Sequence, residues 1–194
     1  MLILYYATNT CSLAAHIALE DAGADYELRR IDFTRTEQQS PEYLKVNSKA
    51  RVPAMVTPRG ILTDTPAMLA FIAQSFPDAA LAPLNDVFAF AELHHAHRMR
   101  GYRWAYEASS FADMQRKVPE SVSACYDLIE TRMLKGPWVM GDNYTIADPY
   151  LFTLAQWLED DGVKPERIPR VIEHRNRVAE RPSVKRAIAA ESAV

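Results

Sequence analysis

Cysteine is scarce in this sequence, because only Cys11 and Cys125 occur among its 194 residues. Two cysteines are too few for a disulfide scaffold, so a reducing compartment is the simpler assumption and each thiol has to be judged by its own surroundings. The third residue after Cys11 is Ala14 rather than a second cysteine. The missing C-x-x-C pair excludes a dithiol redox cycle at this site.

The sequence also lacks an excess of either charge and a long apolar run. Its 22 lysines and arginines against 25 aspartates and glutamates give a formal net charge of -3. That balance offers no electrostatic reason to bind nucleic acid or an anionic membrane. No apolar run is long enough to cross a bilayer, and residues 1–6 lack the basic region of a signal peptide. We therefore expect a cytoplasmic protein with no nucleic-acid or membrane partner.

The chain has the composition of a globular protein, with 48% apolar and 24% charged residues and a length that suits one large domain or two small ones. Up to Pro77, short apolar runs mix with helical patterns. This order, β-α-β followed by a connecting segment and β-β-α, predicts a compact α/β domain with a mixed sheet. The expected strands are residues 2–6, 27–31, 54–57 and 61–63, and the expected helices are residues 12–22 and 66–76.

Strand signals stop after Pro77, and helical patterns follow to the end of the chain. Residues 82–85 resemble a linker. We expect an α/β domain at residues 1–79 and an all-helical domain at residues 86–194. Three stripes at helical spacing mark the second domain: Val118, Val122, Cys125, Ile129 and Met133; Ala147, Leu151, Leu154, Ala155 and Leu158; and Ile168, Val171, Ile172 and Arg175.

Cys11 stands where the first strand gives way to the first helix, after the polar residues 8–10. A helix N-terminus carries about half a positive charge and offers free N–H groups, both of which favour a thiolate. This placement predicts a pKa below the free value of about 8.5. The alternative is a small hydrophobic side chain buried under the helix. The local sequence leaves both interpretations open.

Two further segments could hold a ligand through their backbone. A cis bond before Pro53 would free the Val52 N–H and C=O to pair with an extended peptide, although a trans proline that starts a strand is the commoner case. Asp64, Thr65 and Pro66 open a helix, with Thr65 suited to the N-cap and Pro66 to the first helical position. That end could take a carboxylate while Asp64 faces an ammonium, or it could simply cap the helix.

The remaining motifs favour structural roles. Thr145 and Asp148 have the spacing of a capping box. His94 and His97 would share a helical face while His95 points away, and no carboxylate or thiol with firm spacing completes a zinc site, so we expect no metal. The nearby helical aromatics fit a core or the wall of a cleft better than a platform for nucleic acid: Tyr102, Trp104 and Tyr106.

Taken together, these segments resemble the glutathione S-transferase family, and most closely its bacterial beta class. The match runs nearly from end to end in the expected order. It implies an N-terminal thioredoxin-like domain, an all-helical C-terminal domain and a homodimer. The segments that carry it are residues 4–6, 11–19, 46–54, 62–65, 141–148 and 180–184.

The resemblance implies a site for glutathione as co-substrate. Cys11 would contact its sulfur, with Ser12 and Thr10 as neighbouring candidates. Val52, followed by a cis Pro53, would pair with the cysteinyl part. The γ-glutamyl end would lie against Asp64 and Thr65, and the glycyl carboxylate would lie near Arg35.

The chain departs from the family on the helical side of this site. Beta-class enzymes usually place a histidine of the second domain beside the sulfur, and an ungapped count puts Trp104 there, as part of the wall of the electrophile site. The implied reaction is attack of the glutathione thiolate on a small electrophile, with detoxification as its purpose. Glutathione-dependent disulfide exchange through Cys11 is the alternative reaction. A non-catalytic ligand-binding or regulatory protein on the same fold is the third possibility.

Overall fold

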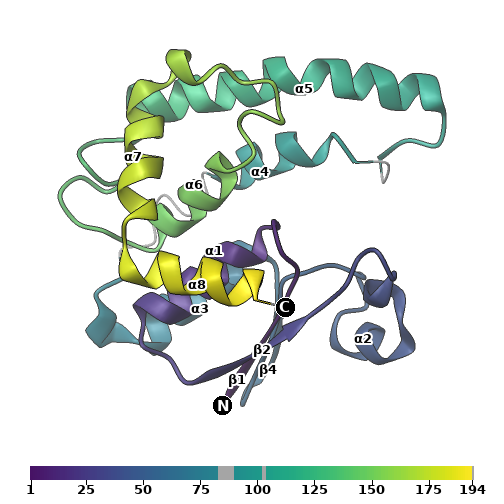
Figure 1. Ribbon diagram of the computed structural model, residues 1–194, viewed down its shortest axis with the longest axis vertical. Helices are drawn as coiled ribbons and strands as arrows, with labels where there is room; N and C mark the ends of the chain where they lie inside the picture. Colours follow the sequence, from purple (N-terminus) through teal and green to yellow (C-terminus); the bar gives the residue numbers. More distant parts are fainter. Residues whose placement is uncertain (83–89, 102–103, 194) are drawn as a thin grey trace.

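The computed structural model describes residues 1–82, 90–101 and 104–193. A four-stranded sheet with its covering helices comes first, and a series of helices follows (Figure 1). This order confirms the expected α/β plus all-α fold. The division into residues 1–79 and 86–194 stays a prediction, and of the expected linker only Ala82 lies within the described residues.

The sheet has the strand order β2-β1-β3-β4, so the first strand lies inside it. β1 pairs in parallel with β2, as the intervening helix α1 requires, and antiparallel with β3. β3 and β4 form the expected hairpin. β2 begins one residue earlier than expected. The strands are β1 (Leu2–Tyr6), β2 (Tyr26–Arg30), β3 (Ala54–Thr57) and β4 (Gly60–Thr63).

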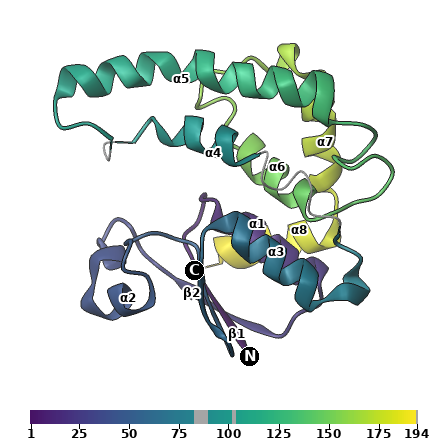
Figure 2. The same cartoon turned by 180° about the vertical axis from the view of Figure 1, so that it is seen from behind.

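One face of the sheet is covered by α1 (Ser12–Asp21) and α3 (Thr65–Ser75). Leu4 and Met55 alternate inward from the strands and meet Leu69 and Ile72 of α3 in the core. α1 has apolar residues on all sides, which is the pattern of a helix surrounded by protein. It lies between the sheet and the helical half (Figure 2).

A short helix in the connecting segment was not expected. α2 (Pro41–Val46) starts with Ser40, whose hydroxyl accepts a hydrogen bond from the Tyr43 N–H as an N-cap. Its six residues are too few to show a helical period in sequence. Tyr43 packs with Ile31 and Ala54 in a small core of its own.

The helical half has the stripes that the sequence predicts. Val118, Val122 and Ile129 are buried on one of them. The elements of this half are α4 (Phe90–Arg98), α5 (Ala108–Leu128), η4 (Ile129–Met133), α6 (Ala147–Ala155), α7 (Pro169–Ala179) and α8 (Pro182–Ser192), with the short turn η5 (Pro165–Arg167) before α7. The first half has the short turns η1 (Glu37–Gln39) and η2 (Pro77–Ala79).

The last helix, α8, returns to the first half and packs along α1 (Figure 1). The buried His16 ring of α1 lies 3.0 Å from a carboxylate oxygen of Glu191 in α8. At the other end of α1, Asp21 accepts hydrogen bonds from Ser183 at 2.6 Å, Tyr144 at 2.7 Å and Arg181 at 3.0 Å. The two halves are therefore joined through polar contacts in the middle and at the C-terminal end of α1.

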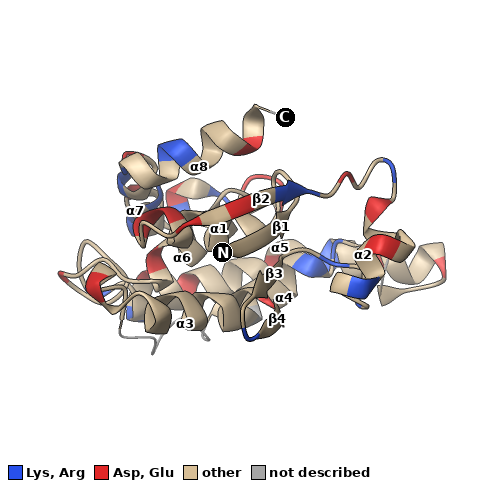
Figure 3. Cartoon of the chain, turned by 90° about the horizontal axis from the view of Figure 1, so that it is seen from below, with Lys and Arg blue, Asp and Glu red and all other residues tan. Residues whose placement is uncertain are grey.

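Acidic and basic side chains lie on the same elements, as on α2 and α7 (Figure 3). Among the described residues, no helix combines the length and the apolar character that a membrane span needs.

The capping box at the start of α6 is formed, and it does more than cap a helix. Asp148 is fully buried and accepts hydrogen bonds from the backbone N–H of Thr145 at 2.7 Å and of Val139 at 2.9 Å. Its carboxylate also lies 2.8 Å from Nε2 of the buried His174 in α7. One carboxylate thus joins a loop, the start of α6 and the middle of α7.

We expect Asp148→Ala to lower the free energy of unfolding by about 3 kcal/mol or more, because it leaves two buried N–H groups and a buried imidazole without an acceptor. Urea denaturation of the purified protein measures this. Asp142→Ala, in the exposed part of the same loop, is the control and should change stability by no more than about 0.5 kcal/mol. Equal midpoints for the two variants would contradict the assigned role.

Candidate active site

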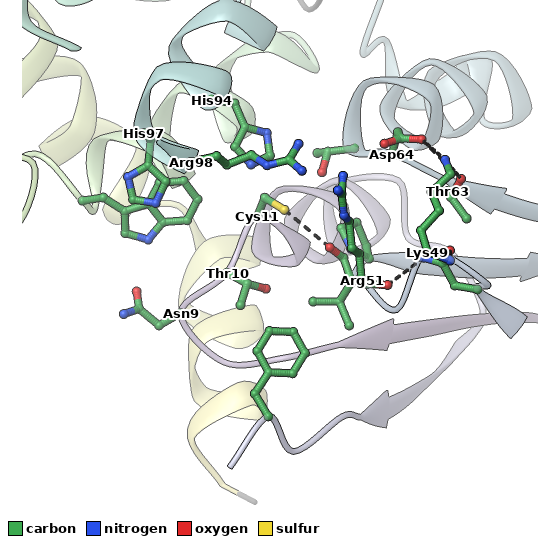
Figure 4. A pocket seen from close by; sticks show the side chains of 16 residues that line it. Asn9, Thr10, Cys11, Lys49, Arg51, Thr63, Asp64, His94, His97 and Arg98 are labelled. Carbon is green, nitrogen blue, oxygen red and sulfur yellow. Dashed lines mark hydrogen bonds and ion pairs between the residues drawn. The ribbon is translucent and has the colours of Figure 1, made fainter. Parts of the chain in front are cut away.

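A pocket of about 230 Å³ lies between the thioredoxin-like half and the helical half. Its floor and one wall come from the loops at the ends of β1, β2, β3 and β4, and the opposite wall comes from α4 and the end of α6 (Figure 4). The first group consists of Asn9, Thr10, Cys11, Phe33, Asn47, Lys49, Arg51, Val52, Pro53, Thr63, Asp64 and Thr65. The second group is His94, His97, Arg98 and Trp157.

Cys11 occupies the centre of this pocket, directly before α1 (Figure 4). Its thiol points across to the Val52 carbonyl, at a sulfur-to-oxygen distance of 3.7 Å. Burial raises the pKa of the Cys11 thiol, and the smaller opposing effects of the Thr65 hydroxyl and the Arg98 charge do not cancel it. The expected lowering of the Cys11 pKa is therefore wrong, because the loss of solvent around the thiol raises the pKa more than these contacts lower it.

The two neighbours of Cys11 have different positions. Thr10 lines the pocket, and its hydroxyl donates to the Ala7 carbonyl at 2.8 Å. Ser12 is fully buried on the other side of the loop, where its hydroxyl bonds to the Ala7 backbone and lies 2.7 Å from the Thr10 hydroxyl. Ser12 shapes the loop and does not face the pocket, which corrects its place among the candidate catalytic residues.

The bond between Val52 and Pro53 is cis, as the resemblance implies. The Arg51 carbonyl just before it accepts hydrogen bonds from the Tyr43 hydroxyl at 2.6 Å and the Asn47 side-chain amide at 2.7 Å. The short helix α2 thus supports this turn, and the turn presents the Val52 carbonyl to Cys11.

Asp64 and Thr65 lie at the start of α3, with one correction to their roles. α3 begins at Thr65, so the residue in the N-cap position is Asp64, whose φ of 74° is unusual for a residue other than glycine. The Asp64 carboxylate lies 2.7 Å from Nζ of Lys49, and this contact lowers the pKa of Asp64. The buried Thr65 hydroxyl is the strongest of the influences that lower the Cys11 pKa.

Arg35 does not reach the pocket. Its exposed side chain lies on the loop after β2, 3.9 Å from a carboxylate oxygen of Glu37. The basic residues that do line the pocket on this side are Lys49 and Arg51. Both fall within the segment that resembles the family, so their closeness to Pro53 was a signal that could have found them.

Trp104 also lies outside the pocket. Its indole N–H donates to the Arg98 carbonyl at 2.9 Å, its ring packs against His95, and it is 38% exposed. The wall is instead formed by residues of α4 that sequence reasoning set aside. His94 and Arg98 are four residues apart and so share a helical face, a spacing that could have revealed them.

The polar groups of this helical wall are firmly held. Nδ1 of His94 lies 3.0 Å from the hydroxyl of the buried Tyr150, and burial is the main cause that lowers the pKa of His94 to about 4. The His97 ring stacks on Trp157 with ring centres 4.0 Å apart. His97 also lies 2.7 Å from a carboxylate oxygen of the buried Asp161.

Within the described part of the chain, no three His, Cys, Asp or Glu side chains gather as a metal site would require. The expectation of no metal stays a prediction.

Comparison with known protein families finds a match for each half of the chain. The model for the glutathione S-transferase N-terminal domain matches residues 1–74, and the model for the C-terminal domain matches residues 95–191. The glutathione S-transferase GstA of Escherichia coli O157:H7 is 28% identical, over 97% of this chain and 98% of its own length.

Solved structures agree along the whole chain. A glutathione transferase homologue from Sulfitobacter, crystallised with bound glutathione, is 37% identical and has a TM-score of 0.93, with 100% of this chain and 99% of that one covered. The beta-class glutathione S-transferase of Sphingomonas chungbukensis is 29% identical with a TM-score of 0.85, over 99% and 100% of the two chains. These comparisons confirm the fold that the resemblance implies.

The raised pKa predicts how the Cys11 thiol of the free protein reacts. In a Cys125→Ser variant, which leaves Cys11 as the one cysteine, alkylation by iodoacetamide should be slow at neutral pH. Its rate should rise with a midpoint above about 8.5, the value of an ordinary cysteine, because only the thiolate reacts. Free glutathione alkylated over the same pH range serves as the reference thiol. A midpoint below that value would show that the helix N-terminus outweighs burial.

Proposed function

The chain belongs to the glutathione S-transferase family, and we propose that it is an enzyme that joins the sulfur of glutathione to small electrophiles. The observation that carries this proposal is the convergence on one pocket of the Cys11 thiol, the Val52 carbonyl and the start of α3. Two bacterial relatives are named glutathione S-transferases, and a homologue 37% identical to this chain binds glutathione.

Glutathione would lie along the floor of the pocket. Its γ-glutamyl end carries an ammonium, which suits the Asp64 carboxylate, and a carboxylate, which suits the first N–H groups of α3 beside Thr65. The ammonium would share Asp64 with Lys49, which already holds that carboxylate in place. The cysteinyl part would pair with the backbone of Val52, and this puts its sulfur next to Cys11.

The proposed reaction is a displacement or addition at an electrophilic carbon. The glutathione thiol loses its proton to solvent, and its sulfur then forms a bond to the carbon. With an aryl halide, the carbon–halogen bond breaks and the halide leaves with the bonding electrons. Cys11 stays protonated because its pKa is raised. It can therefore turn its S–H from the Val52 carbonyl to the glutathione thiolate, which the dipole of α1 also stabilises.

Disulfide exchange is the second candidate, because Cys11 is a pocket-lining thiol. Attack on a disulfide needs the Cys11 thiolate, and burial disfavours that species. Conjugation uses the thiolate of glutathione instead and does not depend on ionisation of Cys11. The structure thus favours conjugation over disulfide exchange. It also favours conjugation over a purely ligand-binding role, because binding alone would need no thiol in the pocket.

Three further parts of the proposal rest on family resemblance. We propose that the protein is a homodimer, that it acts in the cytoplasm, and that it serves in detoxification of electrophiles. Its moderate net charge of -3 supports the proposed lack of nucleic-acid partners.

An assay of two reactions on the same protein tests the proposed activity. We expect wild type to accelerate glutathione conjugation of 1-chloro-2,4-dinitrobenzene clearly above the uncatalysed rate. Cys11→Ser should keep that activity within about tenfold, since a hydroxyl can still donate one hydrogen bond to the thiolate. It should lose any exchange with hydroxyethyl disulfide, and Cys125→Ser should keep both activities. Exchange without conjugation would reverse the assignment.

The γ-glutamyl anchor is tested by binding alone. Asp64→Asn keeps the shape of the side chain but removes the charge that the ammonium would meet, so the Kd for glutathione should rise about tenfold or more. Isothermal titration calorimetry measures this. Asp78→Asn removes an exposed carboxylate of the same half outside the pocket, and it should bind glutathione like wild type. An unchanged Kd for Asp64→Asn would remove Asp64 from the site.

A further inference from the structure

Arg98, at the end of α4, is a cation of the pocket with no carboxylate in ion-pair contact among the described side chains. Its guanidinium lies 5.6 Å from the centre of the Trp104 ring, which leaves its N–H groups available. Figure 4 shows its side chain extending into the pocket beside His94 and toward Cys11. The positive charge of Arg98 lowers the pKa of both His94 and Cys11, as a close cation does.

Three neighbouring basic side chains already lie against carboxylates. The Asp161 carboxylate lies 2.7 Å from Nδ1 of His97 and 3.1 Å from Nη1 of Arg100. On the opposite wall, Lys49 holds Asp64. Arg98 is therefore the positive charge of the helical wall that is left to meet an anion from outside.

His94 adds a neutral donor at the same place. Burial holds the pKa of Tyr150 well above its usual range, so the Tyr150 hydroxyl keeps its proton, and we assign it as the donor to Nδ1 of His94, 3.0 Å away. The imidazole is neutral near pH 7 because its pKa is about 4. With Nδ1 accepting, the remaining proton is on Nε2. The wall thus presents a guanidinium together with an N–H donor.

A flat aromatic surface adjoins these donors. The His97 and Trp157 rings stack with an interplanar angle of 17°, and both line the pocket. A planar ring fits against such a surface, while a carboxylate on that ring fits the fork of a guanidinium.

We propose that the electrophile of this enzyme is an aromatic molecule that carries a carboxylate, bound by Arg98 and the Nε2–H of His94. The inference rests on the proposed function and adds its substrate class. Arg98 acts as the specificity-determining residue, because it supplies a full positive charge from the helical wall. His94 orients the carboxylate without adding charge.

The same guanidinium also favours the thiolate of bound glutathione, since it lies near Cys11. That effect is independent of the electrophile, whereas recognition of a carboxylate is not. A matched pair of electrophiles that differ only in that charge separates the two roles.

The experiment compares 4-chloro-3-nitrobenzoate with its methyl ester. In both, the glutathione sulfur displaces chloride from the same ring position, and each rate is divided by its uncatalysed rate to remove the difference in reactivity. Wild type should show the higher normalised kcat/KM for the acid. Arg98→Met should lower that value about tenfold or more for the acid and less than about twofold for the ester.

Two variants complete the set. Arg98→Lys keeps a positive charge and should recover part of the activity on the acid. Arg116→Met removes an exposed arginine of α5 outside the pocket, and should match wild type on both compounds. Equal losses of acid and ester activity in Arg98→Met would overturn the proposal, because Arg98 would then act on glutathione.

Binding of the product distinguishes failure of this inference from failure of the proposed function. If wild type conjugates neither compound and also fails with 1-chloro-2,4-dinitrobenzene, the proposed conjugation activity is contradicted, and calorimetry with 4-(glutathion-S-yl)-3-nitrobenzoate and its methyl ester decides the subsite. Tighter binding of the acid that is lost in Arg98→Met, with glutathione affinity unchanged, supports the carboxylate subsite. Equal Kd values for acid and ester in wild type would overturn it.

Discussion

The enclosure of α1 (Ser12–Asp21) on all sides is the constraint on which the rest of the structure depends. The helix packs against the sheet and α3 on one side and against α6 and α8 on the other. Two of its polar side chains, His16 and Asp21, are bonded to residues of the helical half. Because Cys11 directly precedes α1, the position of the thiol depends on both halves of the chain. The site is therefore a property of the assembled molecule.

A second constraint decides which charges reach the pocket. The buried Asp161 holds two basic side chains, His97 and Arg100, and so keeps them against the wall itself. Four residues after His94, Arg98 has no such carboxylate among the described side chains and extends into the pocket. The wall of α4 thus has two kinds of basic side chain. Those bonded to Asp161 are held in place, whereas Arg98 is left to face the ligand.

The order of strands and helices along the chain and the placement of Cys11 could be predicted, because strand and helix periods are local and the family motifs follow one another along the chain. The errors come from effects with no local signal. Ser12 is next to Cys11, yet its side chain turns to the other face of the loop. Arg35 and Trp104 were placed by alignment across loops, where insertions shift the register. The spacing of His94 and Arg98 puts them on one face of α4, but it is the packing of α4 that turns this face to the pocket.

The Cys11 thiol illustrates how burial changes the chemistry expected of a motif. A cysteine before a helix suggests a thiolate nucleophile, but here desolvation destabilises the thiolate more than the Thr65 hydroxyl and the Arg98 charge stabilise it. The thiol stays neutral and bonds to the Val52 carbonyl. A neutral thiol is a poor nucleophile toward disulfides and a usable donor toward another sulfur anion. The same residue, in the same place, therefore favours a reaction in which glutathione, and not the protein, supplies the attacking sulfur.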